Sequence, residues 1–502
     1  LTSDLWLYAI HGTNPEIIHL LEENNVMPNS YKQCLLESIK CHHNDIKEYF
    51  ENNYNNQISD LDFENIKQGI KYFNFIELSK DHIKRSDVFY YLCKYDYCQI
   101  IRLLENINFN KIDINWQRKK QVDNKDDGFH LNFMNYEFQK FEKKYEDNKT
   151  PLIAAIENGN IEIVEMLLQK RDINVQLKFK SSFQILYDGN YCYLNGGDTK
   201  SILYIAAENG YHEIVQLLIN RKDIDINEIN RIKDCMSVKK MAALHIAVTN
   251  EHIEVVSKLL DAKNINPNII ESDTISYSDC SEKTPLNIAI EKENAQIVKL
   301  LLSNEKTDIN HACNIYIHCI VCDAPDYNIP VNNFTPLQMA VEKENKEIVQ
   351  MLLDTNNVKI NQIGLNRMAN YRGVGHKNTE TALHIAVEKN NFDIVQMLLS
   401  YNGIDVNSIG LFKEKNEKDV KCYVCYDKIW REKTPLLIAV ENENAKIVEL
   451  LLKNANVKKN KKLTITKKIY GDDAKMHKTI EKIDALSIAV EKNNNLIIDI
   501  LK

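Results

Sequence analysis

The sequence lacks the long apolar segment that a membrane-spanning helix requires. No stretch approaches the roughly 18 consecutive apolar residues of such a helix, so we expect no membrane insertion. The first residues, LTSDLWLYAIHG, contain neither a basic n-region nor a cleavage pattern, which argues against a signal peptide. They also lack an initiator methionine, and the last residues lie inside an expected helix without a polar cap. We therefore expect a longer parent protein.

Cysteine is too sparse for a disulfide scaffold, and a net positive charge is missing. The chain has 12 cysteines among 502 residues and a formal net charge of −8. Without a secretory route, reduced thiols in the cytoplasm or the nucleus are the expected state. The negative charge argues against nucleic acids and anionic membranes as partners, because both select basic surfaces.

The length predicts more than one folding core. A chain of 502 residues exceeds what one compact core usually holds, so we expect several domains or an extended array. A hydrophobic content of 44% and a charged content of 27% are typical of a folded soluble protein.

One motif organises the chain, and its clearest copy is TPLLIAVENENAKIVELLL, from Thr434 to Leu452. Thr434 is suited to cap a helix, and Pro435 is suited to the first helical position. Apolar residues then recur at helical spacing in two short segments separated by a tight turn. Helices this short are not stable alone in water, so the motif requires a neighbour of the same kind.

The motif occurs eight times, and two of its positions are the same in every copy. It starts at Thr150, Ser201, Ala242, Thr284, Thr335, Thr381, Thr434 and Asp484. Leucine stands two positions after each start, where it fills the core between repeats, and alanine stands five positions after, where a larger side chain would overpack. Between the two helices we expect a left-handed turn at Gly159, Gly210, Asn294, Asn345, Asn391 and Asn444.

Segments such as TPLNIAIEKENAQIVKLLL and TALHIAVEKNNFDIVQMLL resemble ankyrin repeats, and the resemblance covers residues 150–502. It implies an all-α dominated ankyrin-repeat solenoid, in which helix-turn-helix repeats stack and long finger or hairpin inserts project from them. It also implies a non-catalytic protein that binds partners through the fingers and the concave face of the first helices. His245 and His384 are implied to hold the adjoining loop by hydrogen bonds.

The spacing of the copies departs from that family. The starts are 41 to 53 residues apart, whereas an ankyrin repeat usually spans about 33 residues. The surplus follows each second helix, after short runs such as Asp308-Ile309-Asn310. Inserts of this kind map to loops on one face of a solenoid, often the binding face.

The chain divides into three predicted parts. Residues 1–115 are predicted to be an N-terminal helical domain of degenerate ankyrin-like repeats, with residues 60–80 as candidates for one further pair. This part resembles a helical domain of unknown function that precedes ankyrin arrays in large protist families. Residues 116–149 are predicted to form a long finger or linker, and residues 150–502 the eight regular repeats.

Two inserts concentrate cysteine and histidine. One contains Cys313, His318, Cys319 and Cys322, and the other contains Cys422 and Cys425. Zinc prefers four tetrahedral ligands, so the first set is a weak candidate for structural zinc or a thiol site. Its residues lie in strand-like sequence, where neighbours point to opposite faces. Ordinary hairpin thiols are therefore favoured, and we expect neither a metal nor a cofactor.

A column of acids and a set of finger aromatics are the candidates for partner binding. The column lies at the ends of the first helices and includes Glu291, Glu342, Glu388 and Glu441. Solvated helix polarity is the favoured interpretation, and selection of a partner with basic groups is the alternative. The aromatic candidates are Tyr191, Tyr193, Tyr316, Tyr327, Tyr371, Tyr423, Tyr426 and Trp430. Aromatics are enriched at interface hot spots, although they equally pack finger against finger.

These features together predict a non-catalytic scaffold for a protein partner whose identity the sequence does not specify. Two alternatives stay open. One is a zinc or thiol site in the Cys/His inserts, and the other is the interaction region of a longer enzyme.

Overall fold

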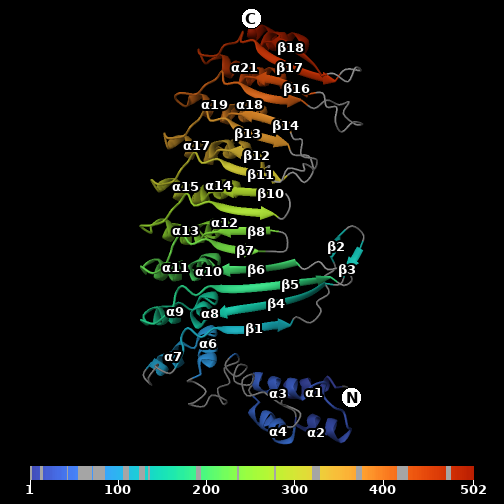
Figure 1. The fold of residues 1–502 in the computed structure, drawn as a ribbon, viewed down its shortest axis with the longest axis vertical. Helices are drawn as coiled ribbons and strands as arrows, with labels where there is room; N and C mark the ends of the chain where they lie inside the picture. Colours follow the sequence, from blue (N-terminus) through green and yellow to red (C-terminus); the bar gives the residue numbers. More distant parts are fainter. Residues whose placement is uncertain are drawn as a thin grey trace. The chain divides into compact units, whose positions relative to one another are not determined.

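Figure 1 draws the helices and strands of the computed structural model of the chain. The chain divides into two units, residues 1–224 and residues 225–502. The described residues are 3–11, 15–41, 43–54, 71, 85–105, 112–123, 131–133, 136–138, 140–187, 194–233, 237–275, 279–318, 328–368, 376–414, 428–470 and 476–502. Within them, no helix combines the length and the apolar content needed to cross a bilayer. The three-part division predicted from the sequence differs from these two units and stays a prediction.

The first unit begins with four helices around a shared apolar core. They are α1 (Leu5–His11), α2 (Pro15–Glu23), α3 (Tyr31–Lys40) and α4 (Asn44–Tyr54). The core includes Trp6, Ile10, Leu35 and Phe50, none of which is more than 1% exposed. Trp6 keeps its indole N–H satisfied by donating it to the carbonyl of Val26 at 2.7 Å. The helices α6 (Ser86–Lys94) and α7 (Cys98–Glu105) follow.

The rest of the first unit combines helix pairs with antiparallel strands. Its strands are β1 (Arg118–Asp123), β2 (Leu131–Phe133), β3 (Tyr136–Phe138), β4 (Lys140–Lys149), β5 (Phe179–Tyr187) and β6 (Leu194–Lys200). Its helices are α8 (Pro151–Glu157), α9 (Ile161–Leu168), α10 (Ile202–Glu208) and α11 (His212–Ile219). β4 pairs with β1 on one side and with β5 on the other, and β5 pairs with β6. Residues 116–149 thus contribute strands to this sheet.

The second unit contains six helix pairs among its described residues. They are α12 (Ala243–Thr249) with α13 (Ile253–Leu260), α14 (Pro285–Glu291) with α15 (Ala295–Ser303), α16 (Pro336–Glu342) with α17 (Lys346–Asp354), α18 (Ala382–Glu388) with α19 (Phe392–Ser400), α20 (Pro435–Glu441) with α21 (Ala445–Leu452), and α22 (Ala485–Glu491) with α23 (Asn495–Leu501). Each first helix packs against the first helix of the next pair, and each second helix does the same.

A hairpin precedes each of these pairs. The strands are β7 (Asn230–Lys233), β8 (Ser237–Met241), β9 (Glu271–Ile275), β10 (Asp279–Lys283), β11 (Cys313–His318), β12 (Asn328–Phe334), β13 (Gly364–Met368), β14 (His376–Glu380), β15 (Gly410–Glu414), β16 (Lys428–Lys433), β17 (Leu463–Tyr470) and β18 (Met476–Ile483). Each strand pairs antiparallel with the next in sequence, within and between hairpins, so the inserts form a sheet along the unit. The fold is therefore a helical-repeat solenoid with a sheet, and "all-α" describes only its helical half. Extended inserts stacked beside one another satisfy their backbone N–H and C=O groups by pairing.

The motif residues explain why each first helix begins where it does. All eight motif starts are N-cap residues, and the hydroxyl of Thr434, for example, accepts from the N–H of Leu437 at 3.3 Å. Seven of the eight motif leucines are buried, and Leu486 is partly exposed. All eight motif alanines are at most 1% exposed, consistent with the close helix contact inferred from their size.

The turn between the helices lies one residue earlier than the asparagines predicted for it. The left-handed residues are Gly159, Gly210, Glu251, Glu293, Glu344, Asn390, Glu443 and Asn493. The prediction was correct for the two glycines and wrong for Asn294, Asn345, Asn391 and Asn444, which cap the second helices instead. The side chain of Asn294, for example, accepts from the N–H of Ile297 at 3.0 Å. The asparagine side chain caps the second helix by accepting from one of its unpaired N–H groups, so the left-handed residue lies just before the asparagine.

An asparagine ladder joins consecutive repeats just before the hairpins. In the second unit its members are Asn227, Asn268, Asn310, Asn361 and Asn407, and Asn115 has the same role in the first unit. The amide of Asn310 donates to the carbonyl of Asn357 at 3.0 Å, and its oxygen accepts from the N–H of Lys359 at 2.7 Å. Each member therefore satisfies one donor and one acceptor on the backbone of the next repeat.

Candidate binding surface

Lysine and glutamate pair at the ends of the first helices in four of the eight regular repeats. The lysine is the last residue before the N-cap, and the glutamate ends the helix eight residues later. The Nζ–Oε distances are 3.1 Å for Lys149–Glu157, 2.9 Å for Lys200–Glu208, 2.6 Å for Lys283–Glu291 and 2.6 Å for Lys433–Glu441. In these four repeats the predicted acid column is thus neutralised by a cation that the hairpin brings to it.

In the fifth repeat the glutamate pairs with a lysine from a different position. Phe334 stands where four other repeats have lysine, and Glu342 pairs instead with Lys389 of the next repeat at 2.8 Å. Glu342 therefore also has a cation beside it, although its side chain is 42% exposed. Exposed pairs of this kind contribute little to stability, about 0–1 kcal/mol.

The sixth repeat breaks the pattern. Glu380, at the end of β14, occupies the lysine position, so two carboxyl groups, Glu380 and Glu388, replace a lysine–glutamate pair. Glu380 is only 2% exposed, and its Oε1 has no hydrogen-bond partner. Burial, reinforced by the charge of Glu388, raises the pKa of Glu380 to about 8.

Glu388 is the accessible member of this pair. It lies at the protein surface and has no ion pair within the described part of the chain. Partial desolvation raises its pKa, while Lys433 opposes that change from a distance. Lys433 itself contacts Glu441. The sixth repeat therefore presents an exposed carboxylate without an ion pair among the described residues, as does Glu491 of the eighth repeat, where Ile483 stands at the lysine position. Only in the sixth repeat does a second carboxyl group stand at the lysine position.

Two buried histidines fix the loops beside this surface, as the resemblance implied. In His384, Nδ1 accepts from the N–H of Thr381 at 3.2 Å, and Nε2 lies 3.1 Å from the carbonyl of Lys433. In His245, the partners are the N–H of Ala242 and the carbonyl of Ile269. Burial lowers the pKa of each histidine to about 4, so both are neutral near pH 7.

Other side chains take the same position in the neighbouring repeats. The Oδ1 of Asn287 accepts from the N–H of Thr284 at 2.9 Å. Gln338 accepts from the N–H of Thr335 and donates to the carbonyl of Glu380 at 2.8 Å. The hydrogen bonds need an acceptor and a donor on one side chain, and they do not require an imidazole.

The predicted aromatic candidates are placed only in part. Tyr316 lies on β11, opposite Cys280 and Pro330, and Trp430 lies on β16, opposite Lys413 and Thr466. Tyr191, Tyr193, Tyr327, Tyr371, Tyr423 and Tyr426 lie outside the described residues.

The Cys/His insert does not bring its described candidates together. Cys313 begins β11 and His318 ends it, which separates their backbones by roughly 16 Å in an extended strand. Cys313 is buried, and this raises the pKa of its thiol to about 11. Because of the separation, the two residues cannot bind one ion. Cys319, Cys322, Cys422 and Cys425 lie outside the described residues.

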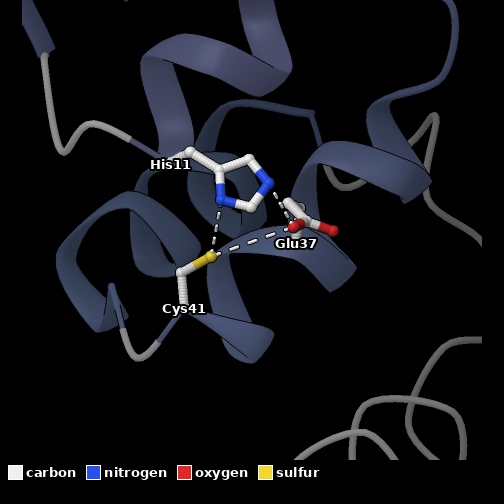
Figure 2. A group of neighbouring side chains, drawn as sticks. All are labelled: His11, Glu37 and Cys41. Atoms are coloured by element: carbon white, nitrogen blue, oxygen red, sulfur yellow. Dashed lines mark hydrogen bonds and ion pairs between the residues drawn. The ribbon is translucent and has the colours of Figure 1, made fainter.

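A different cluster of metal-ligating side chains lies in the first unit. Figure 2 shows His11, Glu37 and Cys41 pointing toward one another. His11 Nε2 lies 2.7 Å from Glu37 Oε1, and His11 Nδ1 lies 3.3 Å from Cys41 Sγ. Burial, followed by the charge of Glu37, raises the pKa of the Cys41 thiol. Sequence reasoning missed this cluster because no short motif links His11 to α3, although Glu37 and Cys41 have the spacing of one helix face.

Comparison with protein families identifies the repeats. A family model described as ankyrin repeats in three copies matches residues 73–230, 175–271, 203–314, 275–363 and 312–409, and a single ankyrin-repeat model matches residues 431–462. No curated protein matches the chain. The matches include residues 73–149, where the motif is degenerate. The chain therefore belongs to the ankyrin-repeat family.

Proposed function

We propose that this chain is a non-catalytic scaffold that binds a protein partner along the ends of its first helices and the adjoining hairpins. Ankyrin repeats are in general protein–protein interaction modules. The observation that supports this location is the reversed charge in the sixth repeat, where Glu380 stands at the position of the lysine that pairs with the acid in four other repeats.

The carboxylate of Glu388 indicates the chemistry of the partner. Glu388 is exposed and has no ion pair among the described residues, while buried Glu380 behind it prevents the usual neutralisation. A lysine or arginine from a partner would supply the missing cation and lower the pKa of both carboxyl groups. Such complementarity favours partners with basic side chains and excludes acidic ones by repulsion.

The paired acids contribute less to this recognition. Glu291 and Glu441 already hold a lysine at 2.6 Å, so an incoming cation would have to compete with it. We therefore place the anchor of the interface at Glu388 and treat the rest of the column, with the finger aromatics, as its extension.

A random peptide library displayed on phage tests the proposal without knowledge of the partner. We expect peptides selected on the full chain to be enriched in lysine and arginine. Binding of synthetic copies should fall at least tenfold to a Glu388→Gln variant, which removes the charge and keeps the shape. Glu449→Gln, an exposed carboxylate on the second helix α21, serves as the matched control and should bind normally. Equal binding to the Glu388→Gln and parent chains would overturn the proposed location.

A further inference from the structure

The helix packing of the first unit determines where His11, Glu37 and Cys41 lie. His11 is the last residue of α1, while Glu37 and Cys41 are four residues apart at the end of α3 and so share one face. The buried core that includes Trp6 and Leu35 packs α1 against α3. The packing of α1 against α3 therefore brings the three ligating side chains together.

The distances in this cluster are close to those of a zinc site. Zinc–nitrogen bonds of about 2.0 Å and zinc–sulfur bonds of about 2.3 Å place the two ligand atoms roughly 3.5 Å apart at a tetrahedral angle. Here Cys41 Sγ lies 3.3 Å from His11 Nδ1 and 3.8 Å from Glu37 Oε1. One atom from each residue can be chosen so that all three lie within 4.8 Å of one another.

The protonation of the cluster leaves room for an ion. In the tautomer of His11 that donates Nε2–H to Glu37, the lone pair of Nδ1 faces Cys41 Sγ at 3.3 Å. A cation bound between Nδ1 and Sγ would take the place of the thiol proton. The Glu37 side chain is mostly buried, whereas the His11 side chain is 52% exposed, so solvent can reach the cluster at His11.

We propose that His11, Glu37 and Cys41 form a binding site for one divalent cation of the zinc class. Nδ1 of His11, Sγ of Cys41 and a carboxylate oxygen of Glu37 are the ligands, and water takes the fourth position. Binding releases the thiol proton to solvent and moves Glu37 from its present contacts with His11 Nε2 and Lys40 Nζ, at 2.7 and 3.2 Å, to the ion. The nitrogen and sulfur ligands favour zinc over magnesium and calcium, which select oxygen.

Metal titration of the full chain tests this site. After treatment with a chelator, the protein is titrated with Zn²⁺ against a chromophoric competitor and, separately, with Co²⁺ to record thiolate-to-metal absorption. We expect one equivalent bound with a thiolate band. The Cys41→Ala and His11→Ala variants should lose the band or bind at least tenfold more weakly.

Two controls separate this site from other ligands. His19→Ala removes a comparably exposed histidine, 61% against 52%, and should bind as the parent chain does. A combined Cys313→Ser, Cys319→Ser and Cys322→Ser variant should also bind normally, because it leaves the cluster intact. Far-ultraviolet circular dichroism checks the folding of each metal-free variant, and Cys41→Ser replaces Cys41→Ala if the latter does not fold. The proposal is overturned if the parent chain binds no zinc, if Cys41 and His11 variants bind as it does, or if only the combined variant loses binding.

Discussion

Replacing Glu380 should stabilise the protein, and the gain should grow with pH. Its carboxyl group is buried, and its pKa is raised from an ordinary 4.5 to about 8. In the folded state this group holds its proton, which it would release in the unfolded chain at neutral pH. Its contribution to stability is therefore fully present below pH 4.5 and is lost as the pH rises toward 8.

The size of the effect follows from the two pKa values. One pKa unit corresponds to about 1.4 kcal/mol, so the interval from 4.5 to 8 sets a ceiling of about 5 kcal/mol. Local relaxation and water penetration reduce such penalties, and we expect about 2–3 kcal/mol between pH 5 and pH 8. Glu380→Gln removes the titrating group and keeps its shape, so its advantage should be larger at pH 8 by this amount.

A second variant tests the cause directly. Glu380→Lys introduces the arrangement of four other repeats, with a cation positioned to contact Glu388 as Lys433 contacts Glu441. It should be at least as stable as Glu380→Gln at pH 8.

Urea denaturation at pH 5, 7 and 8, followed by circular dichroism, measures these differences, and hydrogen exchange of the β14 and α18 amides localises them. Glu481→Gln, at an exposed glutamate on β18, serves as the control and should change stability by less than about 0.5 kcal/mol. If Glu380→Gln and the parent chain differ equally at pH 5 and pH 8, the reasoning about this carboxyl is wrong.

Three further predictions concern the framework. Acid should destabilise the repeats as the pH falls from 6.5 toward 4, by up to about 3 kcal/mol for His384. The pKa of this histidine is lowered to about 4 in the folded state, so the unfolded chain takes up the proton first. His384→Gln, which copies the Gln338 of the preceding repeat, should reduce this loss of stability in urea denaturation at acid pH. Asn310→Ala should lower the free energy of unfolding by about 1–3 kcal/mol, because two hydrogen bonds are lost. The control Gln350→Ala loses one exposed hydrogen bond within α17 and should cost about a few tenths of a kcal/mol. Equal urea midpoints for the two variants would contradict this. Gly159→Ala should lower the melting temperature, because this residue has φ +72° and an added Cβ would lie 3.0 Å from the Tyr211 ring; an unchanged melting temperature would contradict the strain.

The repeat pattern was sufficient to predict the helices, because each motif residue stabilises structure within its own repeat or the adjacent one. A threonine hydroxyl that caps a helix and a leucine that fills the adjacent core work within one or two repeats, so Thr434 and Leu436 indicate their roles directly. The left-handed residue was misplaced because Asn294 has two possible roles, in the turn or at the cap, and the sequence alone does not choose between them.

The remaining features depend on neighbours far apart in the sequence. Glu380 was not identified from the sequence because it is unusual only in comparison with Lys283 and Lys433, which occupy the same position in other repeats. That comparison requires the hairpin ends and the helix ends of the repeats to be aligned. The cluster at His11 depends on the packing of α1 against α3, across 30 residues of chain. The sheet depends on pairing between hairpins, and alternation within one insert does not specify that partner.

The asparagine ladder separates the spacing of the repeats from the length of their inserts. Each member, such as Asn310, fixes the next repeat through two backbone hydrogen bonds before its own hairpin begins. The distance between neighbouring helix pairs is therefore already fixed at the base of the hairpin, before its strands pair with those of the neighbouring hairpins. Residues at the end of a hairpin, beyond this pairing, can be lengthened, shortened or replaced while the helix pairs on either side keep their register. This chain is therefore a suitable frame for grafting new binding loops one repeat at a time.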